Sequence, residues 1–167
     1  MISHRLAVLA MSVLVASLQV AAQGLLDNAT FAKQLQSWQV VAAPELAYAA
    51  TDADGYKDNT SLRCTVAAAH GGGPVSQAFD CAQNTDYVIT AALKSDGRIN
   101  PMVRVIEVGT ERVLVGVVAN RHKGWVLFTE RFNSGNAKEL TVQILGRAPL
   151  GKKAKPVAGA SGIDDVQ

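Results

Sequence analysis

The stretch Ser61-Leu62-Arg63-Cys64-Thr65-Val66 alternates strictly between apolar and polar residues. In a β-strand this period of two places Leu62, Cys64 and Val66 on one face. The same period recurs over residues 86–94, and both stretches contain the β-branched residues that strands favour. The pattern predicts a chain built from half-buried strands.

Further short strands follow one another along the sequence. We expect them over residues 38–41, 75–81, 102–108, 112–118, 125–132 and 140–145. Clusters of turn residues separate them, such as Gly71-Gly72-Gly73-Pro74 and Asn133-Ser134-Gly135-Asn136. No stretch has the period of a long amphipathic helix. The chain is therefore predicted to be an all-β sandwich or barrel.

Length and composition limit the possible classes of protein. A chain of 167 residues is the size of one domain, and its 49% hydrophobic content is sufficient for a core. The 16 Lys and Arg residues nearly balance the 14 Asp and Glu residues, for a net charge of +2. A dedicated nucleic-acid-binding domain is strongly basic, so no nucleic-acid partner is expected.

The N-terminus has the layout of a secretory signal peptide. His4 and Arg5 precede an apolar run from Leu6 to Leu18, and the small residues of Val20-Ala21-Ala22 follow. The apolar run is too short for a transmembrane helix, which needs about 20 residues. We expect residues 1–22 to be cleaved, leaving a domain over residues 23–167 with no transmembrane segment. Its location would be periplasmic or extracellular.

Export would bring the two cysteines, Cys64 and Cys81, into an oxidising compartment. If residues 61–66 and 75–81 form a hairpin with these cysteines opposite one another, its turn falls on Gly72-Gly73, a favoured hairpin connection. A Cys64–Cys81 disulfide is therefore expected. The alternative is a pair of free thiols.

An acidic loop precedes the strand at Ser61. Its sequence is Asp52-Ala53-Asp54-Gly55-Tyr56-Lys57-Asp58-Asn59. Carboxylates at alternate positions around a glycine can converge on a calcium ion, which makes Asp52, Asp54 and Asp58 candidate ligands. A solvated turn is the alternative, because turns also favour Asp, Gly and Asn.

Several anchor residues occur in a recognisable order. They are Asn28-Ala29-Thr30-Phe31 with Trp38, then Asn59-Thr60-Ser61-Leu62-Arg63, Ser76-Gln77, Thr85 to Ala91, Trp125 with Phe128 and Phe132, and Ile163-Asp164-Asp165-Val166. This order resembles the galactose-binding-like jelly rolls, which include the carbohydrate-binding modules of cellulases and xylanases. The resemblance implies a jelly-roll β-sandwich of two antiparallel sheets. In that family an acidic residue after the opening Phe and an Asp of the closing strand often hold a structural calcium ion. Asp165 matches the second ligand, but Ala32 replaces the first.

The resemblance also sorts the few aromatic residues, which are 5% of the chain. It implies that Trp38, Tyr87, Trp125, Phe128 and Phe132 lie mostly in the core. Tyr48 and Tyr56 then remain as surfaces on which a sugar ring could stack. The polar side chains expected to contact a sugar are Arg63, Arg121 and His122.

The sequence carries no motif of a hydrolase active site: it has no G-x-S-x-G and no H-E-x-x-H. We therefore expect an exported, noncatalytic module that binds a polysaccharide, an oligosaccharide or a cell-envelope glycan. One alternative is a structural or adhesion module of the cell envelope without sugar affinity. A second alternative is an enzyme acting on glycosides through a pair of carboxylates.

Overall fold

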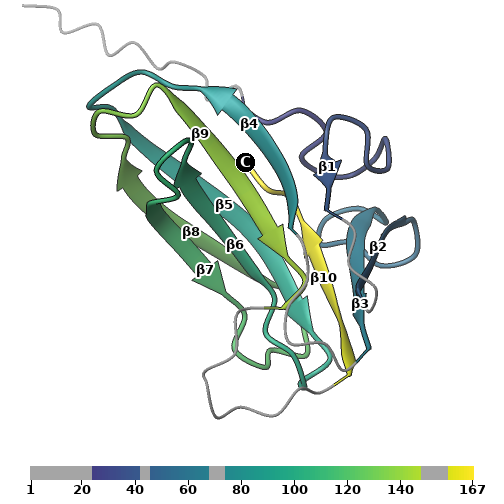
Figure 1. Cartoon of the computed structure of the whole chain (residues 1–167). Helices are drawn as coiled ribbons and strands as arrows, with labels where there is room; N and C mark the ends of the chain where they lie inside the picture. The colour runs from purple at the N-terminus through teal and green to yellow at the C-terminus, as the bar shows by residue number, and fades with distance from the viewer. Residues whose placement is uncertain (1–23, 42–45, 68–73, 148–157) are drawn as a thin grey trace, which may run out of the picture.

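The computed structural model describes residues 24–41, 46–67, 74–147 and 158–167 (Figure 1). The expected signal peptide and the expected Gly72-Gly73 turn lie outside these residues. The strands are β1 (Gln39–Val40), β2 (Leu46–Thr51), β3 (Ser61–Val66), β4 (Val75–Asp80), β5 (Asp86–Ser95), β6 (Met102–Glu107), β7 (Val113–Val118), β8 (Val126–Asn133), β9 (Glu139–Leu145) and β10 (Gly159–Asp164). This part of the chain contains no helix that could cross a membrane.

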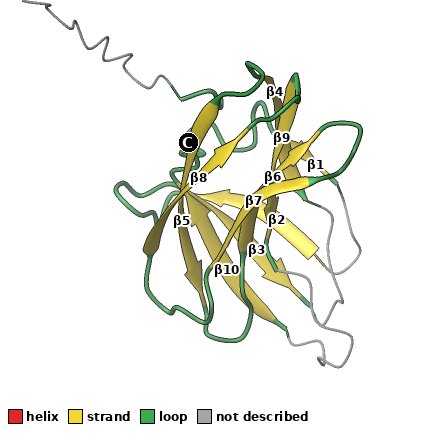
Figure 2. Ribbon diagram, turned by 90° about the vertical axis from the view of Figure 1, so that its left-hand side faces the viewer, coloured by secondary structure: helices red, strands yellow, loops and turns green. Residues whose placement is uncertain are grey.

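The ten strands form two five-stranded antiparallel sheets (Figure 2). One sheet has the order β1-β4-β9-β6-β7 and the other β2-β3-β10-β5-β8. Neighbours within a sheet are mostly distant in sequence, because the chain crosses repeatedly from one sheet to the other. The predicted jelly-roll β-sandwich of two antiparallel sheets is confirmed.

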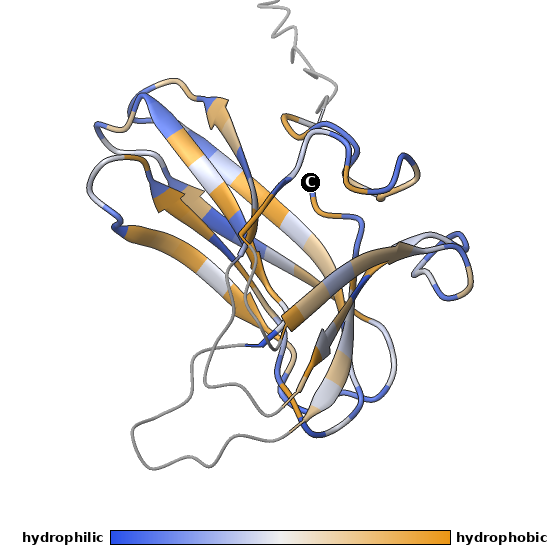
Figure 3. Cartoon of the chain, turned by 45° about the vertical axis from the view of Figure 1, so that its right-hand side comes forward, coloured by the Kyte–Doolittle hydropathy of each residue, from blue (hydrophilic) through white to orange (hydrophobic). Residues whose placement is uncertain are grey.

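The core lies between the sheets, where the period-two pattern places it. In β3, Leu62, Cys64 and Val66 are buried, whereas Arg63 and Thr65 are exposed. Figure 3 shows such alternating hydrophobic and hydrophilic bands along several strands. Burial of these apolar side chains, at about 25 cal/mol per Å², supplies most of the drive to fold.

The predicted hairpin between residues 61–66 and 75–81 is wrong, because β3 and β4 belong to different sheets. Cys64 lies opposite Tyr48 of β2 and Ser161 of β10. Cys81 follows β4, and its thiol contacts the carbonyl oxygen of Ala137 at 3.4 Å. Both cysteines are free, so the expected disulfide is also wrong. Alternation identifies the buried face of a strand but not its partner, and consecutive strands in a jelly roll need not pair.

The chain turns sharply after β10. Asp165 has a positive φ of 48°, in the left-handed region that few residues other than glycine adopt. After this turn the backbone of Gln167 exchanges two hydrogen bonds with Thr90 of β5, at 2.9 and 3.0 Å. The final residues therefore continue the pairing of β10 with β5 as far as Thr90.

Candidate functional site

The outer face of the sheet β2-β3-β10-β5-β8 has a floor of small residues at its centre. Gly162 of β10 lies in register with Arg63 of β3 on one side and with Lys94 of β5 on the other. Ala160 precedes it on the same face of the strand. Because the central strand carries almost no side-chain volume here, the longer side chains of its neighbours stand above it as walls.

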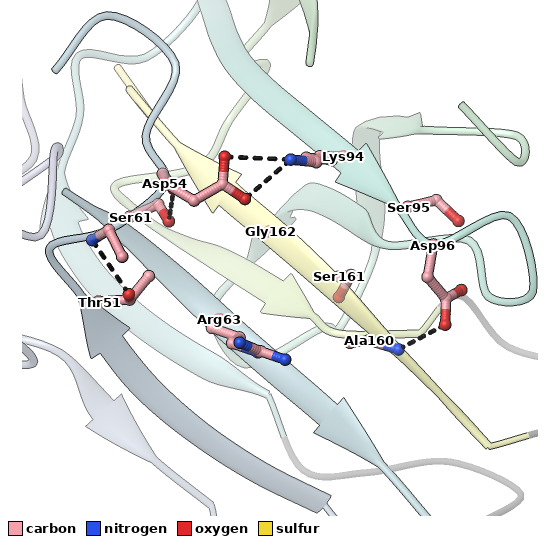
Figure 4. A pocket seen from close by; sticks show the side chains of 11 residues that line it. Thr51, Asp54, Ser61, Arg63, Lys94, Ser95, Asp96, Ala160, Ser161 and Gly162 are labelled. Atoms are coloured by element: carbon pink, nitrogen blue, oxygen red, sulfur yellow. Dashed lines mark hydrogen bonds and ion pairs between the residues drawn. The ribbon is translucent and has the colours of Figure 1, made fainter. Parts of the chain in front are cut away.

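A shallow pocket of about 220 Å³ occupies this floor (Figure 4). Its polar lining comes from four strands and two adjoining loops. The lining includes Thr51, Asp54, Ser61, Arg63, Lys94 and Asp96. The sheet thus gathers two cationic and two anionic side chains, together with hydroxyl groups, around one depression.

Trp125, just before β8, lies beside this pocket. A β-carbon added to Gly162 would come within 2.8 Å of Cη2 of the indole, so the ring covers the glycine. The indole Nε1 donates a hydrogen bond of 3.1 Å to Asp54 Oδ1, and Lys94 Nζ lies 5.8 Å from the ring centre. Trp125 is half-buried on the outer face. The prediction that Trp125 lies in the core is wrong. Gly162 has no side chain, so the indole can pack directly on its backbone on the outer face of the sheet.

Asp54 connects the acidic loop to this face. Its carboxylate oxygens lie 2.8 and 3.0 Å from Lys94 Nζ. This hydrogen-bonded pairing is the main cause that lowers the pKa of Asp54 below its ordinary value. The loop conformation depends on Gly55, where a β-carbon would clash with the carbonyl oxygens of Asp58 and Thr60. The loop therefore positions Asp54 above the sheet.

The four carboxylates proposed as calcium ligands do not converge. Within the described ranges no three acidic, histidine or cysteine side chains are grouped as metal ligands. Asp58 accepts hydrogen bonds of 2.7 Å from the backbone and hydroxyl of Thr60. Asp165 pairs with Lys57 Nζ at 2.7 Å, and Asp52 is exposed. Together with the salt bridge of Asp54, these contacts direct the carboxylates to separate partners.

The two tyrosines expected to be stacking surfaces have different environments. Tyr48 packs against the core; its hydroxyl accepts a hydrogen bond from the Gly146 N–H at 3.0 Å and donates one to the Ile144 carbonyl at 3.4 Å. Burial raises its pKa strongly. Tyr48 is therefore not a stacking surface, and that prediction is wrong. Tyr56 is half-buried, and its backbone N–H donates to Asp164 Oδ2 at 2.8 Å.

Of the three polar contacts expected from the sequence, only Arg63 lines the pocket. Arg121 and His122 are exposed on the loop between β7 and β8. The His122 carbonyl accepts a hydrogen bond from the Ser95 N–H at 2.8 Å, so this loop adjoins one end of the pocket. Sequence reasoning missed Lys94 and Asp96. Lys94 could have been found, since the alternation of residues 86–94 already places it on the outer face.

The distribution of aromatic rings separates the two outer faces. The chain has nine Phe, Tyr and Trp residues, and seven of them are buried or pack around the core: Phe31, Trp38, Tyr48, Phe79, Tyr87, Phe128 and Phe132. The outer face of the other sheet carries instead a hydrogen bond of 2.9 Å from Arg104 Nε to Gln143 Oε1. Only Trp125 and Tyr56 remain as surface rings, and both belong to the β10 side of the molecule.

The fold is similar to solved carbohydrate-binding modules. A CBM4 structure aligns at a TM-score of 0.61 and 15% identity, over 84% of this chain and 96% of that chain. A family 16 carbohydrate-binding module gives 0.62 and 14%, over 86% and 98%. The CBM22-1 xylan-binding domain of Paenibacillus barcinonensis Xyn10C gives 0.52 and 15%, over 79% and 84%. At these identities the likeness shows the fold, which is that of a carbohydrate-binding-module jelly roll.

No protein-family model matches this chain, and no curated protein sequence matches it either.

Proposed function

We propose that this chain is a noncatalytic carbohydrate-binding module whose ligand lies along the outer face of β10. The observation that carries the proposal is the placement of Trp125 over Gly162, beside a pocket lined by charged and hydroxyl side chains. A sugar presents apolar C–H faces and a rim of hydroxyl groups. An aromatic ring suits the first, and fixed donors and acceptors suit the second.

The polar lining supplies both kinds of hydrogen-bonding partner. The Arg63 guanidinium offers several donors in a planar fork, while the carboxylates of Asp54 and Asp96 are acceptors. Asp96 already accepts a hydrogen bond of 2.9 Å from the Ala160 N–H, which fixes its orientation at the pocket edge. Such preorganised groups reduce the entropy lost when a ligand binds.

The proposal includes the expected processing of the chain. Residues 1–22 act as a cleaved signal peptide, and residues 23–167 form the binding domain in the periplasm or outside the cell. Polysaccharides and cell-envelope glycans occur in these compartments. Support comes from the layout of residues 4–22 and from the similarity to solved carbohydrate-binding modules.

Affinity gel electrophoresis tests the proposal. The protein is run through gels containing xylan, mixed-linkage β-glucan, galactan, galactomannan or polygalacturonate, and is separately pulled down on insoluble cellulose. We expect retardation or retention by at least one polymer. Trp125→Ala should abolish it, whereas Leu127→Ala, which removes a 41% exposed side chain on β8 two residues further along the chain, should retain it.

Wild-type mobility unchanged in every gel, with no retention on cellulose, would refute sugar binding. That result would favour the alternative of a structural or adhesion module of the cell envelope. Equal retention of the Trp125→Ala and wild-type proteins would show that sugar binds elsewhere on the molecule.

A further inference from the structure

Arg63 projects from the strand beside the central one, and its side chain lines the outer pocket. The residues in register with it on the two neighbouring strands are Ala49 of β2 and Gly162 of β10. An opposite charge on a neighbouring strand would stabilise such a side chain, but alanine and glycine carry none. Among the residues that the structure describes, the Arg63 side chain forms no hydrogen bond or ion pair (Figure 4). Its N–H donors are therefore available to a ligand.

The other three charged side chains of the pocket have partners within the protein. Lys94 Nζ pairs with the two carboxylate oxygens of Asp54, at 2.8 and 3.0 Å. Both carboxylate oxygens of Asp96 accept hydrogen bonds from backbone N–H groups, at 2.8 and 2.9 Å. Each negative charge of the pocket is thus stabilised by the protein itself, whereas the positive charge of Arg63 has no counterpart in the described part of the chain.

Further cations lie on the two loops that meet at the Asp96 end of the pocket. Arg98, Arg121 and Lys123 are exposed there, and none of them belongs to an ion pair of the described residues. The Lys123 side chain lies against Gly97, because a β-carbon on that glycine would come within 3.0 Å of its Cε. Excess positive charge around a depression raises the local concentration of anions. This end of the pocket therefore favours an anionic ligand over a cationic one.

A carboxylate is the natural counterpart of the Arg63 guanidinium. The planar guanidinium can bind it through two parallel N–H···O bonds, which also fix its orientation. Arg63 is in register with Gly162, on which the Trp125 indole packs, so a sugar stacked on the indole would lie beside the guanidinium. We propose, as a refinement that rests on the proposed function, that the pocket binds an acidic polysaccharide. The carboxylate of a hexuronate residue pairs with Arg63 while a ring of the same glycan stacks on Trp125.

Polysaccharides matched in backbone but not in charge test the proposal. Polygalacturonate, alginate, glucuronan and hyaluronan are each compared with the carboxyl-reduced form of the same polymer by affinity gel electrophoresis. EDTA in the gels prevents bridging by calcium. We expect at least one acidic polymer to bind the protein at least tenfold more tightly than its reduced, neutral form. Failure of all four acidic polymers to bind, or equal or tighter binding of every reduced form, would overturn the proposal.

Arg63→Gln removes the guanidinium but keeps a polar side chain at this exposed position. It should weaken binding of the acidic polymer at least tenfold and leave the affinity for neutral polymers unchanged. Arg131→Gln is the matched control, because it removes the same charge from an exposed position on β8. Arg131 is six residues beyond Trp125, roughly 20 Å at 3.3 Å per residue, and its variant should bind like the wild-type protein.

The remaining outcomes separate the acidic ligand from sugar binding itself. Equal losses in Arg63→Gln and Arg131→Gln would show a nonspecific attraction between charges and would overturn the proposal. Retention by neutral polymers that depends on Trp125 but not on Arg63 would overturn it as well, while leaving the proposed function intact. If no polymer of either kind retards the protein, the proposed function fails together with the assignment of its ligand.

Discussion

The indole Nε1 of Trp125 donates a hydrogen bond to Asp54 Oδ1 at 3.1 Å, joining residues 71 positions apart in sequence. The bond connects the start of β8 to the loop between β2 and β3. The same carboxylate pairs with Lys94 of β5, so three segments meet over Gly162. The orientation of Trp125, the only tryptophan on the outer surface, thus depends on the Asp54–Lys94 salt bridge and on the absence of a side chain at Gly162.

Gly162→Ala tests whether sugar binding depends on the packing of the Trp125 indole against Gly162. The new methyl group would lie 2.8 Å from Trp125 Cη2, so the ring must move. We expect a shift in tryptophan emission and at least a threefold loss of polysaccharide retention in affinity gels. Gly116→Ala is the matched control: its methyl group would meet the flexible end of Met102 on the other sheet at the same distance. Equal retention by the two variants would show that sugar binding does not depend on the packing of Trp125 against Gly162.

The Asp54–Lys94 pair predicts an acid transition in the groove. The pKa of Asp54 lies below its ordinary value of 3.8, chiefly because of its hydrogen bond to Lys94. Its stabilising effect is therefore present above the unfolded-state pKa and is lost as the pH falls through the lowered folded-state pKa. We expect a change in tryptophan fluorescence centred below pH 3.8. It should be absent in Asp54→Asn, which keeps a neutral acceptor; an identical transition in that variant would assign the change to other groups.

Thiol titration tests whether Cys64 and Cys81 are free thiols rather than a disulfide. The denatured, unreduced protein should react with two equivalents of Ellman's reagent, because both cysteines are free. In the native protein Cys81 should react first, since Cys64 is fully buried and its burial raises its pKa to about 12. The Cys81→Ser variant should therefore show almost no fast-reacting thiol. If the denatured protein has no reactive thiols, the two cysteines form a disulfide after all.

Tyr48→Phe separates a structural role from a binding role. The change removes the hydroxyl that accepts a hydrogen bond from the Gly146 N–H at 3.0 Å. Loss of a largely buried hydrogen bond should reduce the free energy of unfolding by about 1–2 kcal/mol, measurable by urea denaturation. Retention on polysaccharide gels should match the wild-type protein. Weaker retention with an unchanged free energy of unfolding would show that Tyr48 contributes to sugar binding.

The fold class could be read from the sequence because alternation is a local signal. The pattern of residues 61–66 coincides with β3, and that of residues 86–94 differs from β5 by one residue. The strand β2 was missed, since Leu46–Thr51 is rich in alanine and gives little contrast between its faces. Strand pairing was also missed, because alternation carries no information about which sheet a strand joins.

The candidate site was only partly predictable for the same reason. Arg63 was anticipated on an exposed face, and the structure places it in the pocket. Trp125 was misplaced because its position depends on Gly162, 37 positions away in sequence and on a strand that is not its direct neighbour. Asp54 was proposed as a calcium ligand, but Lys94 and Trp125 occupy its oxygens. Contacts between distant segments decide all these roles, and residue spacing does not report them.

Nuclear magnetic resonance can locate the glycan, which we propose binds over the outer face of β10. An oligosaccharide of the polymer that retards the protein is titrated into ¹⁵N-labelled protein, with Trp125→Ala used to assign the two indole signals. We predict that the Trp125 indole signal and the backbone amides of Arg63, Lys94 and Gly162 shift together, while the buried Trp38 indole does not. Shifts confined to the opposite sheet, around Arg104 and Gln143, would show that the glycan does not bind over β10.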